Sequence, residues 1–170
     1  MDTQERRQAI ARTLEEASGP VSAASLAKSY SVSRQVIVGD IALLRAGGMD
    51  ISATPRGYLL PRSSTNIIRT LACRHDIAQT EAELNAIVDQ GCTVLDVIVE
   101  HPVYGQLTAQ LHLSSRYEVS QFVSRCHQAD APPLSTLTGG IHLHTISCPG
   151  EDAYLRVQTT LRNMGILVDE

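Results

Sequence analysis

No stretch of the sequence approaches the roughly 18 consecutive apolar residues that cross a membrane as a helix. The chain begins with the polar run Met-Asp-Thr-Gln-Glu-Arg-Arg, which lacks the apolar segment of a signal peptide. Internal repeats and low-complexity stretches are also missing, and the composition is that of an ordinary folded protein. We therefore expect a cytoplasmic protein without membrane contact, whose 170 residues form one large domain or two small ones.

Cysteine is scarce and is never paired at short spacing. The four cysteines, Cys73, Cys92, Cys126 and Cys148, include no CxxC pair. In a cytosolic chain such scattered cysteines are typical of reduced, partly buried thiols. A disulfide or a thiolate metal site is the alternative interpretation.

Positive charge is in the minority over the whole chain, which has a formal net charge of −4, but not over its N-terminal part. Residues 1–62 contain 8 Lys and Arg against 6 Asp and Glu, a net of +2, whereas residues 63–170 contain 6 against 12, a net of −6. All six histidines fall in the acidic part, and the stretch 61–65 has the Pro and Ser content of a short linker. We therefore predict two domains, 1–62 and 63–170, with the basic surface on the first.

The first domain has the pattern of a winged helix-turn-helix. A helix over 5–17 and a short helix over 23–29, capped by Ser22, precede a third helix that begins after Ser33 and ends at Gly47-Gly48. The predicted core face of this third helix consists of Val36, Ile37, Ile41 and Leu44. Strands over 51–53 and 58–60 then form a wing, and Thr54-Pro55-Arg56-Gly57 joins them.

A recognition helix presents its N-terminal residues to base edges in the major groove of DNA. Arg34 and Gln35 follow the capping Ser33, and their side chains are suited to guanine and adenine respectively. Arg45 and Arg56 are better placed for phosphate or a minor groove. The predicted DNA-binding residues are therefore Ser33, Arg34, Gln35, Arg45 and Arg56. The alternative is that Arg34 and Arg45 are solvated helix residues that pair with Asp40.

The second domain alternates between strands and helices. The patterns predict strands over 67–72, 92–99, 107–113, 141–148 and 166–168, and helices over 80–89, 116–128 and 151–163. Thr80 and Glu83 have the spacing of a capping box, and Ser114-Ser115 precedes the helix over 116–128. This order predicts an α+β fold, an α/β sandwich in which helices pack on one face of a mostly antiparallel sheet.

The informative polar residues of this domain are histidines. His142 and His144 are two apart on a strand, so both rings project from one face. His75 ends another strand, and Glu83 lies one turn into the next helix. Three imidazoles and a carboxylate suit Zn²⁺, Ni²⁺, Co²⁺ or Fe²⁺ rather than Ca²⁺ or Mg²⁺. The alternative is that Glu83 only completes its helix cap and the histidines are exposed.

Two resemblances extend these interpretations. Residues 5–60 resemble the helix-turn-helix of biotin-operon repressors at Leu26-Ala27, Val32-Ser33-Arg34, Asp40-Ile41, Leu44-Arg45, Gly48 and Arg56-Gly57-Tyr58. Residues 65–170 resemble the three-histidine (3H) domain at His75, Glu83, His101-Pro102-Val103-Tyr104-Gly105 and His142-Leu143-His144. The order of the two domains resembles the niacin-responsive transcriptional repressor family.

This resemblance implies a repressor that binds double-stranded operator DNA, takes nicotinic acid as co-repressor and controls genes of niacin salvage and uptake or NAD biosynthesis. It also implies a divalent transition metal (Ni, Zn, Co or Fe) at His75, Glu83, His142 and His144. We expect His101 and Tyr104 to line the effector pocket, unless they only shape a turn, and the protein to act as a homodimer. The effector carboxylate then needs a donor such as Arg74, Arg116, Tyr104 or a backbone amide of the turn at 102–105.

Two other functions use the same residues. In the first, the metal ion is itself the effector of the repressor. In the second, the domain is a metal-assisted hydrolase with Glu83 or Glu100 as general base. The sequence has no nucleophile elbow, no phosphate loop and no second carboxylate at a defined spacing, and a DNA-binding module suits sensing better than turnover. We therefore predict a regulator and not an enzyme.

Overall fold

The structure, a computed structural model, describes residues 2–62 and 65–169. Contacts group the chain into two compact units, 1–63 and 64–170. Ser63 and Ser64 of the predicted linker lie outside the described residues. Across the described ranges, the helices are all too short or too polar to pass through a bilayer.

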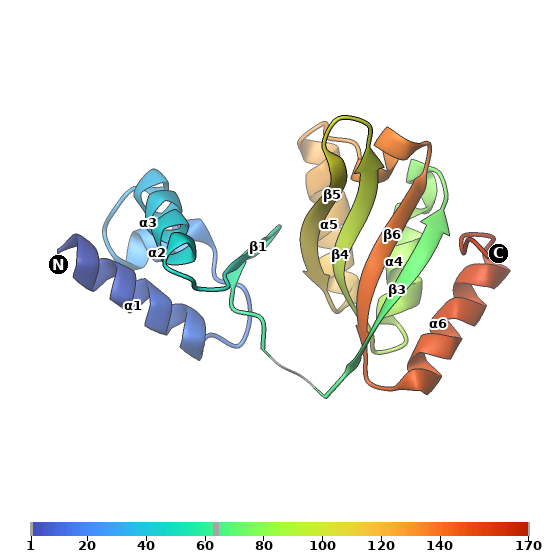
Figure 1. Ribbon diagram of the computed structural model, residues 1–170, viewed down its shortest axis with the longest axis horizontal. Helices are drawn as coiled ribbons and strands as arrows, with labels where there is room; N and C mark the ends of the chain where they lie inside the picture. The colour runs from blue at the N-terminus through green and yellow to red at the C-terminus, as the bar shows by residue number, and fades with distance from the viewer. Residues whose placement is uncertain (1, 63–64, 170) are drawn as a thin grey trace. The chain divides into compact units, whose positions relative to one another are not determined.

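The N-terminal unit has the predicted order of three helices and a two-stranded wing (Figure 1). Its elements are α1 (Thr3–Glu16), α2 (Ala23–Ser29), α3 (Arg34–Ala46), β1 (Ser52–Thr54) and β2 (Gly57–Leu59). Both predicted serine caps are present, because the side chain of Ser22 accepts a hydrogen bond from the amide of Ser25 and that of Ser33 accepts one from Val36. Helix α1 begins earlier than predicted, because Asp2 caps it in a capping box with Glu5.

The core face of α3 differs from the prediction at two positions. Ile37 and Ile41 are buried, but Val36 is 38% exposed and Asp40 is only 3% exposed. Positions 37, 40, 41 and 44 form one face of the helix, and Val36 lies at its edge. The buried carboxylate of Asp40 accepts a hydrogen bond from Nε of Arg6 on α1 at 2.7 Å. Asp40 therefore pairs with Arg6, and not with Arg34 or Arg45 as the alternative interpretation had it.

The wing is attached to the helices through a third segment of chain. Tyr58 pairs with Ala53 across the hairpin and also exchanges two backbone hydrogen bonds with Val21, just before α2. This close approach requires glycine at position 57, where φ is +140° and a Cβ atom would lie 2.4 Å from the carbonyl oxygen of Val21. The wing is thus fixed to the body of the unit at its base.

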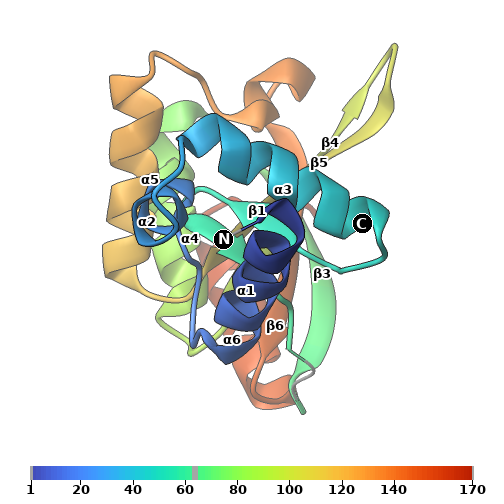
Figure 2. The same cartoon turned by 90° about the vertical axis from the view of Figure 1, so that its left-hand side faces the viewer.

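The C-terminal unit is a four-stranded antiparallel sheet with helices on one face (Figures 1 and 2). The strand order is β3-β6-β4-β5. The strands are β3 (Ile67–Arg74), β4 (Thr93–His101), β5 (Gly105–Leu113) and β6 (Ile141–Cys148), and the helices are α4 (Thr80–Val88), α5 (Arg116–Gln128) and α6 (Glu151–Asn163). Short 3-10 helices, η1 (Ile77–Gln79) and η2 (Leu134–Thr138), precede α4 and β6. The α+β fold is therefore as predicted.

The predicted last strand over 166–168 is only an isolated bridge between Leu167 and Cys73. The backbone of Arg74 donates to Ile166, and the backbone of Val168 donates to Ala72. After the turn at Gly165, which has φ of +69°, the chain stays beside β3 for too few residues to form a strand.

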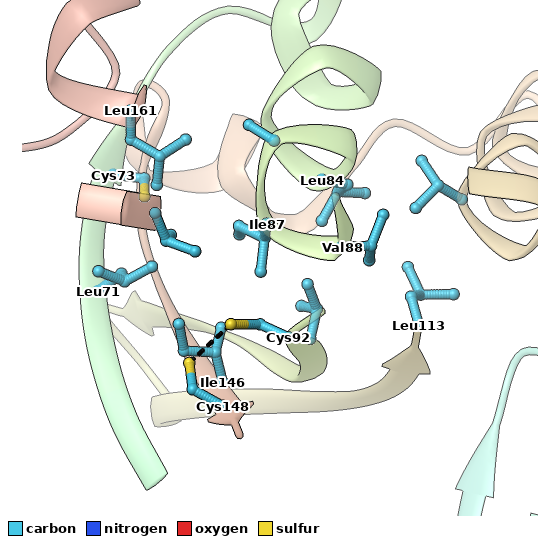
Figure 3. Packing of buried hydrophobic residues seen from close by; sticks show 14 of the residues in the cluster. Leu71, Cys73, Leu84, Ile87, Val88, Cys92, Leu113, Ile146, Cys148 and Leu161 are labelled. Atoms are coloured by element: carbon cyan, nitrogen blue, oxygen red, sulfur yellow. Dashed lines mark hydrogen bonds between the residues drawn. The ribbon is translucent and has the colours of Figure 1, made fainter. Parts of the chain in front are cut away.

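Apolar residues of all four strands and of α4, α5 and α6 form the core between the sheet and the helices (Figure 3). Leu71 and Cys73 project from β3 into this core. Cys92 and Cys148 also lie in it, with their sulfur atoms 2.9 Å apart. All four cysteines are free thiols, and Cys126 alone among them is partly exposed.

Candidate metal centre and nucleic-acid interface

Two neighbouring strands bring the three histidines together on the helix-covered face of the sheet. His142 and His144 lie on β6, and His75 follows the end of β3, which pairs with β6. The ring centroid of His142 lies 4.9 Å from that of His75 and 4.8 Å from that of His144. All three histidines are buried, contrary to the alternative of exposed side chains.

Glu83 of α4 places its carboxylate among the three rings. The Nε2 atoms of His75 and His142 lie 2.7 Å and 2.9 Å from its two oxygens, and Nε2 of His144 lies 3.4 Å away. The residue is only 1% exposed. The structure therefore brings all four predicted metal-binding side chains into one buried cluster, which we call the histidine–Glu83 cluster.

The predicted capping box at Thr80 is wrong. Thr80 has helical backbone angles (φ −56°, ψ −47°), because η1 already turns the chain before α4 begins. A capping residue needs an extended backbone, so Thr80 does not cap the helix, and its hydroxyl has no partner among the described residues. The carboxylate of Glu83 is thereby free of a capping role and faces the histidines.

Each ring of the cluster is held from behind by a backbone carbonyl. Nδ1 of His75 lies 2.6 Å from the carbonyl oxygen of Asp76. Nδ1 of His142 lies 2.9 Å from that of Gly140, and Nδ1 of His144 lies 2.6 Å from that of Asp96. A carbonyl only accepts hydrogen bonds, so we assign the proton of each ring to Nδ1. The Nε2 lone pairs then point at a carboxylate that also only accepts. Such a cluster of acceptors needs a cation at its centre, either protons or a metal ion.

The electrostatics follow from this arrangement. Burial alone would raise the pKa of the Glu83 carboxyl, but the charge of His144 and the hydrogen bonds of all three histidines hold that pKa well below its usual range. Burial would lower the pKa of His75 and His144, but Glu83 outweighs it and raises both. Burial, together with the charge of Glu83, raises the pKa of the nearby Cys73 thiol. Without a metal ion the cluster therefore retains protons, which an incoming ion displaces.

The donor atoms fit a transition-metal ion. Ligand bonds of about 2.0–2.2 Å place neighbouring donors of one ion roughly 3 Å apart in tetrahedral or octahedral geometry. The observed separations between Glu83 and the three Nε2 atoms, 2.7 to 3.4 Å, fall around that value. Imidazole nitrogens with carbonyl-held Nδ1 atoms are the usual ligands of such ions. The residues present therefore fit the metal that the sequence resemblance implies.

Two cavities adjoin the cluster. The larger, about 780 Å³, is lined by His101 and His142 and also by Glu100, Gln106 and Thr138. Tyr104 is 74% exposed and does not line this cavity, although its ring centroid lies 5.0 Å from that of His101. The smaller cavity, about 420 Å³, is lined by Arg74 and His75 and by residues of η2.

The candidate donors for the effector carboxylate differ in whether they already have hydrogen-bond or ion-pair partners. The backbone amides of Val103 and Tyr104 both donate to Nδ1 of His101, so these two amides of the turn are already engaged. Arg116 is occupied by an ion pair with Asp89. Arg74, in contrast, lines a cavity, and its side chain has no hydrogen-bond or ion-pair partner among the described residues.

The predicted DNA-binding residues cluster around α3 and the wing. Arg34 and Gln35 are exposed in the first turn of α3, directly after Ser33. Nε of Arg45 donates to the carbonyl of Ile51 at 2.8 Å, so this residue also braces the wing. Arg56 is half-buried at the wing tip, where its backbone amide donates to Thr54.

Sequence reasoning missed two residues on the exposed face of α3. Val38 is 40% exposed one turn after Arg34, and Gly39 is exposed beside it. An apolar side chain here suits a thymine methyl group. A glycine lets another backbone approach closely. The amphipathic pattern could have revealed both, because neither position falls on the core stripe.

Comparisons with known proteins match two segments of the chain to two domain families. Residues 6–59 match a helix-turn-helix domain family, and residues 68–170 match the 3H domain family. The chain is 46% identical over 167 residues to a "Probable transcription repressor NiaR" of Thermotoga maritima, which covers 98% of this chain and 95% of the relative. It is 42% identical over 169 residues to a "Transcription repressor NadR" of Bacillus subtilis, which covers 97% of this chain and 94% of the relative.

Proposed function

The chain belongs to the family of 3H-domain transcription repressors of the NiaR and NadR type, and from that premise we propose that a metal ion and nicotinic acid control its binding to operator DNA. The repressor names of the relatives indicate a regulator rather than an enzyme. The observation that carries the proposal is the convergence of three carbonyl-held imidazoles on the buried carboxylate of Glu83.

The DNA-binding part of the proposal rests on α3. Arg34 and Gln35 read base edges in the major groove, and Ser33 presents them by capping the helix. Arg56 contacts phosphate or the minor groove from the wing tip. Arg45 supports the wing through Ile51 and reaches phosphate with the rest of its guanidinium. As a homodimer, the protein presents two such helices to half-sites about one DNA turn apart.

Gly39 gives a test of which face of α3 meets DNA. Glycine within a helix costs roughly 0.5–1 kcal/mol relative to alanine, and a Cβ atom at this position meets nothing within 4 Å. We expect Gly39→Ala to raise the free energy of unfolding by about that amount and at the same time to weaken operator binding. Urea unfolding and a mobility-shift titration measure the two effects. Unchanged operator affinity in the stabilised variant would place this face of α3 away from DNA.

The metal part of the proposal assigns His75, Glu83, His142 and His144 as ligands. A bound ion would supply a Lewis-acid position for the pyridine nitrogen of the effector. The carbonyls of Asp76, Gly140 and Asp96 fix the three rings so that Nε2 faces inward. Glu83 supplies the negative charge that offsets the ion.

For the effector, we assign the cavity that His101 and His142 share. Its volume of about 780 Å³ is within the usual range for small-molecule sites. His101 forms one wall, and Tyr104 packs near the His101 ring from outside. Arg74 lines the smaller cavity on the side of His75, so it can serve as the donor only for a carboxylate that extends past the cluster into that cavity.

A mobility-shift titration of metal-loaded protein tests the role of nicotinic acid. A ligand shifts DNA affinity only by its differential affinity for the two states of the repressor. We expect nicotinate to tighten operator binding and nicotinamide, which lacks the negative charge, to leave it unchanged. The same titration after removal of the metal with a chelator should show no effect of nicotinate. If nicotinate leaves the affinity of the metal-loaded protein unchanged, the co-repressor assignment is wrong.

The burial of the four ligands favours one second candidate, in which the ion itself is the effector. The side chains of His75, His142 and His144 are only 1–3% exposed, so an ion there is screened from solvent. In that case, restoring the metal after chelation restores operator binding with no small molecule present.

A further inference from the structure

Cys73 is a sulfur donor beside the histidine–Glu83 cluster. It lies on β3 directly opposite His142 in the register of the sheet, and both face the helices. It is fully buried. Its sulfur, a carboxylate oxygen of Glu83 and a ring nitrogen of His142 all lie within 4.8 Å of one another.

We propose that the thiolate of Cys73 is a further ligand of the metal ion, which makes the donor set three nitrogens, one oxygen and one sulfur. This inference rests on the proposed function, in which His75, Glu83, His142 and His144 hold that ion. A sulfur ligand biases the site toward Zn²⁺, Co²⁺ or Ni²⁺ and against Mg²⁺ or Mn²⁺, which prefer oxygen. The sulfur thereby narrows the class of ion that this chain selects.

The geometry allows a shared ion after a small movement. A metal–sulfur bond of about 2.3 Å and a metal–nitrogen bond of about 2.1 Å keep two donors of one ion within roughly 4.4 Å. The donor atoms of Cys73, Glu83 and His142 all lie within 4.8 Å of one another, so only a small approach of the sulfur is needed. Rotation about the Cα–Cβ bond of Cys73 moves the sulfur without disturbing the pairing of β3 with β6.

The neighbouring position on β3 provides a contrast. Leu71, the preceding core-facing residue of the strand, lies opposite His144 in the same register. The strand thus presents an apolar side chain to one histidine of β6 and a thiol to the other. Cys73 is the residue of this pair that has ligand chemistry.

The chemical step is a ligand exchange without oxidation or reduction. The S–H bond of Cys73 breaks, its proton leaves to solvent, and a bond forms between sulfur and the divalent ion. The alternative role for the thiol is to donate a hydrogen bond to Glu83 and leave the ion to the other four ligands.

Cobalt loading of the full chain distinguishes these roles. A thiolate bound to Co²⁺ gives a charge-transfer band in the near ultraviolet, which imidazole and carboxylate ligands do not give. We expect this band in the wild type, and we expect Cys73→Ser to lose it while still taking up cobalt, with an affinity at least about tenfold lower. Cys92→Ser is the matched control, because Cys92 is equally buried in the same core, and it should keep the band.

X-ray absorption of the zinc-loaded wild type tests the same point without a substitution, so its result does not depend on the folding of a variant. A sulfur neighbour at about 2.3 Å from zinc supports the proposal. Stoichiometric zinc or cobalt with only nitrogen and oxygen neighbours, and no charge-transfer band, overturns the role of Cys73 and leaves the histidine–Glu83 site intact. Failure of the wild type to take up either ion overturns both.

Discussion

Glu83→Gln is expected to lower metal affinity by about two orders of magnitude or more, which corresponds to roughly 3 kcal/mol. The amide keeps the size of the carboxylate but loses the negative charge that balances the ion, at a position 2.7 to 3.4 Å from the three Nε2 atoms. Replacing even an outer-shell partner of a metal ligand costs tenfold to a hundredfold in affinity, and a ligand should cost more. Competition with a chromophoric chelator measures the loss, and elemental analysis of the purified variant provides an independent check.

The same helix offers the matched control. Glu81 lies in the first turn of α4, as Glu83 does, but it is exposed. Glu81→Gln changes the net charge equally and should leave metal content and affinity as in the wild type. If Glu83→Gln also keeps full affinity, Glu83 is not a ligand and the carboxylate serves only to hold protonated histidines.

Thermal unfolding provides a second measurement on the same pair of variants. An ion that binds the folded state but not the unfolded state raises the midpoint of unfolding, by an amount that grows with the free ion concentration. The midpoints of the wild type and Glu81→Gln should therefore fall when a chelator is added. That of Glu83→Gln should not depend on the chelator. A chelator effect that survives in Glu83→Gln would place the stabilising ion elsewhere.

The sequence was sufficient wherever the determining signal is local. Ser22 and Ser33 are predictable because a capping serine acts on an amide three residues ahead. The placement of His142 and His144 on one face follows from the period of a strand. Glu83 shows the limit of local reasoning, because Thr80 and Glu83 have the spacing of a capping box. Only the turn of η1, which gives Thr80 helical backbone angles and so removes it as a cap, frees the carboxylate for the histidines.

The remaining differences come from contacts between residues distant in the sequence. The burial of Asp40 depends on Arg6, which is 34 residues away on another helix, and no pattern within α3 indicates it. The position of Cys73 beside the cluster depends on the register of β3 against β6. A shift of one residue in that register would turn Cys73 to the other face of the sheet. The sequence alone does not determine which register the two strands adopt. The metal ligands came largely from the family resemblance for the same reason.

Arg34→Ala is expected to weaken operator binding by about 1–3 kcal/mol, or roughly tenfold to a hundredfold, if Arg34 makes a bidentate contact with guanine. The loss should be smaller on an operator in which the contacted guanine is already replaced, because a lost base contact also relaxes specificity. Exposed Arg34 has no hydrogen-bond or ion-pair partner among the described residues, so the free energy of unfolding should change little. Mobility-shift titrations on a set of single-base operator variants measure both the loss and its sequence dependence.

Variants of two other arginines serve as controls for Arg34→Ala. One tests the effect of losing a positive charge, and the other tests the effect of losing support for the wing. Arg12 is exposed on α1, and Arg12→Ala removes one positive charge without touching α3. This substitution should lower the affinity slightly and by the same factor for all operator variants. Arg45→Ala removes the hydrogen bond to Ile51 and the contact over the Tyr58 ring, so it should lower stability as well as binding. A loss in Arg34→Ala that is uniform across sequences would assign Arg34 to phosphate, and base reading would then rest with Gln35 and Val38.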